Sequence, residues 1–146
     1  FLGFAFLFTA VILFVCDRLM KKKFDGDVTA KHAVAMGFMQ AAALIPGVSR
    51  SGSTIFGGLV AKGDKKQVTS FAFLMSIPVI LGGCILKFGS GALLQADFLL
   101  LAVGFASSAI SGILAIKLVL KLIGANNFLP FCIYLIVVAV VSFIIM

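Results

Sequence analysis

Long blocks of apolar residues run along this chain, and short polar stretches separate them. A membrane-spanning helix needs about 20 consecutive apolar residues. The blocks at 68–86, 97–116 and 128–146 are each long enough, and a further block occupies 1–16 at the start of the chain. We therefore predict an all-α, polytopic membrane protein with four transmembrane helices, all in one membrane domain that covers 1–146.

Two further apolar blocks, at 32–45 and 55–61, are too short to cross the bilayer alone. The polar stretch PGVSRSGST joins them at 46–54 and contains Arg50. Backbone that is not helical is tolerated at membrane depth only where protein or water surrounds it. The pattern therefore predicts a re-entrant pair of short helices that meet at a polar tip. The alternative is one long, kinked span from 32 to 61 with a packing patch of Gly and Ser in its middle.

The positive charges favour the re-entrant pair. The chain has 12 Lys and Arg residues against 5 Asp and Glu, a formal net charge of +7. In the paired arrangement the basic residues of 17–31 and 62–66 lie on one side together with Lys117 and Lys121, and Lys87 lies on the other. A single span would place the first two groups on opposite sides. Because cytoplasmic loops collect Lys and Arg, we predict that the pair enters from the cytoplasm and that the C-terminus ends outside.

Composition excludes several classes of protein. Hydrophobic residues make up 62% of the chain and charged residues 12%, whereas a soluble domain has about 45–50% and about 25%. A soluble fold, a disordered chain and a nucleic-acid-binding module are therefore excluded in spite of the basic balance. The sequence contains no Glu, so carboxylate chemistry within it depends on aspartate. The three cysteines lie far apart, without the spacing of a metal site or a redox pair.

The polar tip carries the candidate chemistry of the chain. A charged side chain at membrane depth is costly, and such residues are functional candidates by default. The planar guanidinium of Arg50 matches phosphate oxygens, and glycine lets backbone N–H groups approach an anion closely. Ser53 or Thr54 is expected to cap the following short helix, whose N-terminus also favours an anion. We predict a phosphate site; the alternative is that the hydroxyls satisfy backbone groups while Arg50 extends to an interface.

The tip resembles the second signature of a known family, the bacterial undecaprenyl-diphosphate phosphatases, also called bacitracin-resistance proteins. That signature has the form PGxSRSxxT, and this sequence reads Pro46-Gly47-Val48-Ser49-Arg50-Ser51-Gly52-Ser53-Thr54. Three flanking segments are also similar to segments of the family: GFMQAAALIPG at 37–47, FAFLMSIPVILGG at 71–83 and FLPFCIYLIV at 128–137. The resemblance covers the chain from about Met36 to its end.

The resemblance implies an enzyme built of two inverted repeats, each with a re-entrant pair, of which this chain is one half. Such an enzyme removes the terminal phosphate from a C55 isoprenyl diphosphate at the outer face of the bacterial plasma membrane, using a divalent cation such as Mg²⁺ or Ca²⁺. The reaction recycles the lipid carrier for cell-wall synthesis and confers bacitracin resistance. On this basis the catalytic candidates are Arg50 and Ser49. The candidates for substrate binding are Gly47, Ser51, Ser53, Thr54 and, on the preceding helix, Gln40.

One part of the family pattern is missing from this sequence. The first signature has two glutamates four residues apart, a Ser-rich stretch and a His, and His32 does not match that His; we expect it at an interface. Ser70 and Leu135 stand where the family often carries Glu and Arg. Because the chain begins at Phe1 inside an apolar block, we expect it to be a piece of a longer protein. The resemblance implies that the metal ligands and the attacking group lie on the N-terminal half of that protein. The expected partners are the isoprenoid diphosphate lipid, membrane lipids, that N-terminal half and, as an option, a second copy in a homodimer.

Two other classes of function remain open at this point. A secondary transporter or channel also uses discontinuous helices whose N-termini face an anion. A lipid-binding protein without catalytic activity is the third option. A phosphatase releases phosphate in detergent, whereas a transporter is active only across sealed vesicles.

Overall fold

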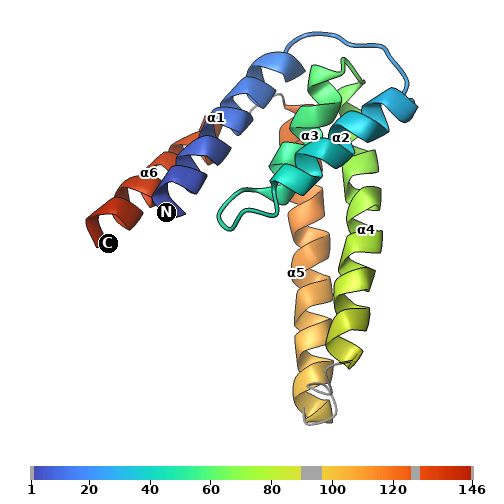
Figure 1. Cartoon of the computed structure of the whole chain (residues 1–146), viewed down its shortest axis with the longest axis vertical. Coiled ribbons are helices and arrows are strands. Elements are labelled where there is room, and N and C mark those ends of the chain that lie inside the picture. Colours follow the sequence, from blue (N-terminus) through green and yellow to red (C-terminus); the bar gives the residue numbers. More distant parts are fainter. Residues whose placement is uncertain (1, 90–96, 126–128, 146) are drawn as a thin grey trace.

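The protein is described by a computed structural model at residues 2–89, 97–125 and 129–145. Within these ranges the regular structure is helical, and the β-type pairing is an isolated bridge between Gly26 and Gly63. The all-α prediction is confirmed. The helices follow one another along the chain (Figure 1) as α1 (Leu2–Met20), α2 (Ala30–Ala42), α3 (Arg50–Val60), α4 (Lys65–Gly89), α5 (Phe98–Gly124) and α6 (Leu129–Ile145).

The short helix α3 lies at the centre of the arrangement, where it packs against α1, α2 and α4. Figure 1 shows α1 and α6 side by side, and α4 and α5 as a long antiparallel pair. The two pairs diverge from the end of the molecule at which α1 ends and α4 begins. The α2–α3 unit lies between them, so its surroundings are protein on both sides.

By length and composition, three of the described helices can cross a membrane: α1, α4 and α5. A fourth, α6, is a shorter apolar helix. Large apolar side chains such as Phe4, Phe105 and Tyr134 are exposed on the outside of these helices, where they need an apolar surrounding. These are the helices of a multi-pass membrane protein, as predicted.

Several helices run beyond the apolar blocks that predicted them. α1 continues to Met20, and Asp17 in this added turn forms an ion pair with Lys21 at an N···O distance of 2.6 Å. α4 covers Lys65–Gly89, whereas the predicted block is 68–86. α5 continues to Gly124 through a last turn that carries a lysine. The added segments contain charged residues, at which the apolar blocks ended. Residues 1, 128 and 146 of the predicted spans lie outside the described residues.

The segment from 30 to 60 folds into two short helices, not into one long span. α2 and α3 lie side by side and run in opposite directions, so Ala30 and Val60 are at the same end of the molecule. The alternative of a single kinked span from 32 to 61 therefore does not describe this fold. Entry of the pair into a membrane stays a prediction.

Glycine makes the close packing of α3 possible. A β-carbon built on Gly57 is 2.7 Å from the carbonyl oxygen of Ala35 on α2. A β-carbon on Gly58 is 2.5 Å from Val68 on α4. Small residues allow membrane helices to approach closely and gain packing contacts where no water is displaced. The glycines of α3 thus hold it tightly against two neighbours at once.

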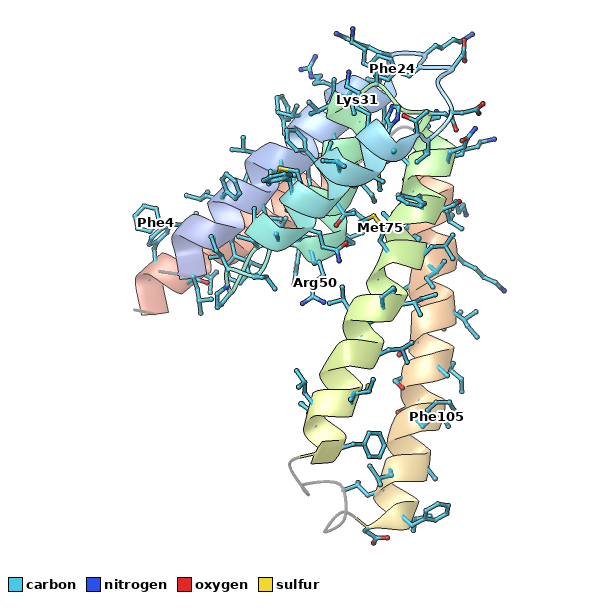
Figure 2. The ribbon with its side chains drawn as sticks, turned by 45° about the vertical axis from the view of Figure 1, so that its right-hand side comes forward. Phe4, Phe24, Lys31, Arg50, Met75 and Phe105 are labelled. Atoms are coloured by element: carbon cyan, nitrogen blue, oxygen red, sulfur yellow. The ribbon has the colours of Figure 1, made fainter. Side chains whose placement is uncertain are left out.

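Basic residues gather at the end of the molecule where α1 ends and α2 begins, and Figure 2 shows Lys31 there. We call this end of the molecule the basic surface. The charged turn before α4 lies at the same end. Hydrogen bonds fasten the two segments together: the Asp64 N–H donates to the Gly26 carbonyl at 3.0 Å, and Gln67 Nε2 donates to Asp27 Oδ1 at 2.9 Å. The segment before α2 and the segment after α3 are therefore joined to each other at this basic surface.

Candidate functional site

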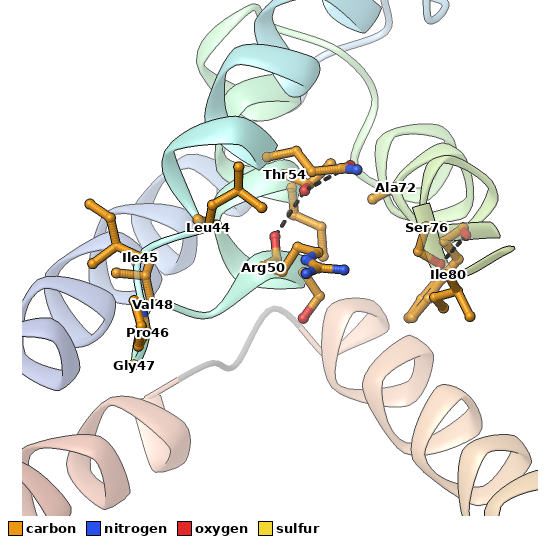
Figure 3. Close-up of a pocket in the computed structure, with 15 residues that line it drawn as sticks. Leu44, Ile45, Pro46, Gly47, Val48, Arg50, Thr54, Ala72, Ser76 and Ile80 are labelled. Atoms are coloured by element: carbon orange, nitrogen blue, oxygen red, sulfur yellow. Dashed lines mark hydrogen bonds between the residues drawn. The ribbon is translucent and has the colours of Figure 1, made fainter. Parts of the chain in front are cut away.

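A cavity of about 580 Å³ opens beside the polar tip (Figure 3). The end of α2, the connection before α3, the first turn of α3 and the middle of α4 surround it. Its wall combines polar and apolar side chains. The polar side chains in the wall are Gln40, Arg50, Ser51, Thr54 and Ser76. The larger apolar ones are Leu44, Ile45, Ile55, Phe73 and Ile80.

Arg50 is the first residue of α3, and its guanidinium points into the space between α3 and α4 (Figures 2 and 3). It also borders a second hollow of about 210 Å³ between α2 and α4. Among the residues that the structure describes, no carboxylate forms an ion pair with Arg50. Within that part of the chain, a positive charge without a carboxylate counter-ion faces the cavity.

Ser49 caps α3. Its Oγ accepts a hydrogen bond from the Gly52 N–H at 3.2 Å, and its extended backbone places it directly before the helix. The expectation that Ser53 or Thr54 caps this helix is wrong, and α3 begins at 50 instead of 55. The polar tip offers four hydroxyl residues, and the first of them, Ser49, already accepts from the Gly52 N–H. Ser49 borders a separate hollow of about 130 Å³ on the α1 side of the tip.

Thr54 and Gln40 connect α3 to α2 at the cavity wall. Thr54 Oγ1 donates to the Arg50 carbonyl at 2.8 Å. Gln40 Oε1 lies 3.5 Å from Thr54 Oγ1 as a second acceptor. The predicted binding residues on two different helices thus lie within hydrogen-bond range of each other. The figure draws the bond between Thr54 and Arg50 as a dashed line (Figure 3).

The other candidates divide between the cavity and the packed interior. Ser51 is exposed and borders the cavity. Ser53 is 1% exposed, lies outside the cavity wall and has no hydrogen-bond partner for its Oγ among the described residues. Gly47 borders the cavity with φ of +92°, a conformation that glycine adopts without steric cost. The candidates that line the main cavity are Gln40, Gly47, Arg50, Ser51 and Thr54.

Sequence reasoning assigned Ser76 of α4 to backbone groups near Pro78 and not to the site, but it lies across the cavity from Arg50 (Figure 3). Its hydroxyl donates to the Phe73 carbonyl at 2.6 Å. Ser76 lies two residues before Pro78, which is inside α4. The adjacent proline was a signal of irregular helix at this point. The distance along the chain concealed that this turn faces the tip.

The described residues do not by themselves form a metal site. No group of three or more His, Cys, Asp or Glu lies together within them. His32 is 8% exposed, and its Nδ1 accepts from the Thr29 N–H at 3.1 Å at the start of α2. That is the end of the molecule with the basic surface, away from the tip. A divalent cation held by carboxylates does not fit the described part of this chain alone.

Comparison with known proteins identifies the family of this chain. The family described as bacitracin resistance protein BacA matches residues 1–141 of this chain. The chain belongs to the BacA family. Among its relatives, a Methanobrevibacter smithii protein named undecaprenyl-diphosphatase is 38% identical over 94% of this chain and 51% of its own length.

Other relatives of the BacA family carry the same name. The undecaprenyl-diphosphatase of Ralstonia pickettii is 42% identical over 79% of this chain and 40% of its own length. The undecaprenyl-diphosphatase 1 of Bacillus cereus is 34% identical over 97% of this chain and 54% of its own length. The chain thus spans about half the length of the curated relatives it matches.

Proposed function

We propose that this chain supplies the phosphate-binding half of a membrane phosphatase that hydrolyses undecaprenyl diphosphate to undecaprenyl phosphate and phosphate. The reaction would recycle the lipid carrier for cell-wall synthesis and confer resistance to bacitracin. The observation that carries this proposal is the Arg50 guanidinium, which faces a cavity at the N-terminus of a helix without a carboxylate partner among the described residues. Membership of the BacA family and the name of the relatives support it.

The first turn of α3 supports binding of an anion. The first N–H groups of a helix have no partner within the helix, and its N-terminus carries a partial positive charge. Ser49 uses the Gly52 N–H for its cap and its own carbonyl for the Ser53 N–H. Ser51 lines the same cavity as Arg50. A diphosphate at this point would meet donors and positive charge together.

The apolar wall supports a lipid over a small soluble phosphate ester. Leu44, Phe73 and Ile80 border the same cavity as Arg50. An amphiphile can place its charged group on the guanidinium and its hydrocarbon chain along α4. A soluble phosphate ester would leave this apolar surface without a partner.

Hydrolysis of a diphosphate needs an attacking group and positive charge on the phosphoryl oxygens. In our proposal Arg50 and the first turn of α3 hold and neutralise the diphosphate, and Ser49 keeps that turn in place. The attacking group and the carboxylates would come from the N-terminal half that the family resemblance implies. We assign no step to a metal ion, because the described residues bring no ligand cluster together.

We further propose that the protein lies in the bacterial plasma membrane with its basic surface in the cytoplasm. The grouping of Lys and Arg at one end supports this orientation, and the tip then faces away from the cytoplasm. The site would open to the outer face, where a lipid diphosphate can enter sideways from the bilayer.

The test is Arg50→Ala in the intact enzyme, with release of phosphate from a prenyl diphosphate in detergent as the measurement. Loss of a charged hydrogen-bond partner costs about 1.5–3 kcal/mol, so turnover should fall by about 10- to 100-fold. Arg50→Lys should recover part of it, and Lys22→Ala on the basic surface is the control. Unchanged turnover in Arg50→Ala would contradict the proposal. Activity in detergent, where no compartment exists, also separates hydrolysis from transport.

A further inference from the structure

Thr9 of α1 contacts the polar tip across about 40 residues of sequence, and the motif gives no hint of it. Its side chain is 1% exposed. The Ser49 N–H donates to Thr9 Oγ1 at 3.2 Å. Thr9 Oγ1 in turn donates to the Ala5 carbonyl at 2.9 Å, with the Gly47 carbonyl at 3.3 Å as a second acceptor. One hydroxyl thus holds both sides of the turn that leads into α3.

The neighbours of Thr9 on α1 continue this contact. Residues four apart lie on the same face of a helix, so Ala5, Thr9 and Leu13 form one row. A β-carbon built on Gly47 is 2.8 Å from Ala5 Cβ, and one on Gly52 is 3.1 Å from Leu13 Cδ2. The row therefore follows the tip from Gly47 to Gly52, and Thr9 supplies its polar member.

The Ser49 N–H lies before the first turn of α3 and has no place in the hydrogen bonds of that helix. Deep in a membrane protein, such a group needs a partner from elsewhere in the protein. Thr9 is that partner, and it does not line the main cavity. Its effect on a bound anion must therefore pass through Ser49 and the direction in which α3 begins.

We propose that Thr9 is a positioning residue for the phosphate site: its hydroxyl fixes the turn from Gly47 to Ser49 and thereby the place of Arg50 over the cavity. This inference rests on the proposed function. Without the hydroxyl, the turn loses its tie to α1, Ser49 caps less well, and the guanidinium samples more positions. The affinity for a diphosphate then falls although no group that touches it has changed.

The experiment compares Thr9→Val, which keeps the shape of the side chain, with Thr9→Ser, which keeps the hydroxyl. Thr69→Val is the matched control, because Thr69 is also fully buried and its hydroxyl donates only to Lys65 of its own helix, at 2.7 Å. Amide hydrogen exchange at residues 48 and 49 reports the turn. Binding of farnesyl diphosphate to the purified protein in detergent reports the site. Should Thr9→Val not fold, Thr9→Ala replaces it in both measurements.

Thr9→Val is expected to speed amide exchange at 48 and 49 and to weaken binding of farnesyl diphosphate, each by about tenfold, as for the loss of one or two hydrogen bonds. Thr9→Ser should stay close to the wild type in both measurements, and Thr69→Val should change neither. Equal losses in Thr9→Val and Thr69→Val, or faster exchange with unchanged affinity, overturn the positioning role. Failure of the wild-type protein to bind the probe instead overturns the proposed function.

Discussion

The close approach of α3 to α2 depends on the missing side chain of Gly57, and Gly57→Ala tests this dependence. The added β-carbon would lie 2.7 Å from the carbonyl oxygen of Ala35, 3.0 Å from its carbonyl carbon and 3.0 Å from Met39 Cγ. Two of these three atoms belong to backbone. A flexible side chain could turn away, but the backbone of α2 can yield only if the whole helix moves. The variant should therefore separate the two short helices.

The size of the effect follows from two opposing terms. Overpacking of a tightly packed site costs about 1–3 kcal/mol. Replacing Gly by Ala inside a helix returns about 0.8–1 kcal/mol. We therefore expect Gly57→Ala to lose stability by up to roughly 2 kcal/mol. Gly82→Ala on α4 is the matched control, because nothing lies within 4 Å of a β-carbon there, so only the favourable term applies.

The assay is reversible unfolding in mixed detergent micelles, followed by circular dichroism, on the wild type and both variants. Gly82→Ala should unfold at the same or a higher denaturant concentration than the wild type, and Gly57→Ala at a lower one. Because the tip joins α2 to α3, Gly57→Ala should also weaken binding of farnesyl diphosphate. If Gly57→Ala proves as stable as Gly82→Ala, the close contact with Ala35 does not hold the pair together and the reasoning is refuted.

Two further predictions concern the basic surface. Asp64→Ala should lower stability by about 0.5–2 kcal/mol, because Asp64 Oδ2 accepts from the N–H groups of Lys66 and Gln67 at 3.0 Å each; Asp64→Asn keeps an acceptor, and an equal loss in both would contradict the capping role. In a variant without its native cysteines, Lys22→Cys and Lys87→Cys should react with an impermeant maleimide from opposite sides of the membrane. Labelling of both from one side would reject the proposed orientation.

Most elements of this fold follow from the sequence because the helices form around apolar blocks. The same logic identified the α2–α3 pair, since blocks of that length cannot span a bilayer. The predicted start of α3 was wrong for a physical reason. Ser49, Ser51, Ser53 and Thr54 are all good capping residues, and local sequence does not rank them.

Ser49, the residue that caps α3, is also contacted by a residue from outside the tip. Thr9 receives the Ser49 N–H, and pattern analysis treats a single threonine in an apolar block as filler. The place of Ser76 in the cavity wall was not predicted either, since a helix pattern does not state which turn faces which cavity. The residues of a site that arise from one motif are predictable; those that arise from packing between distant segments require the fold.

The length of α3 sets how deep a ligand must travel. The helix has 11 residues and rises about 1.5 Å per residue, so its two ends are about 16 Å apart. The hydrocarbon layer of a bilayer is about 30 Å thick. In the proposed orientation, with the Val60 end of α3 at one membrane surface, Arg50 would lie near the midplane, and a headgroup arriving from the far leaflet would have to descend roughly half the membrane. A molecule tethered by a long hydrocarbon tail would make that descent without leaving the bilayer, so depth would favour lipids over dissolved phosphate esters.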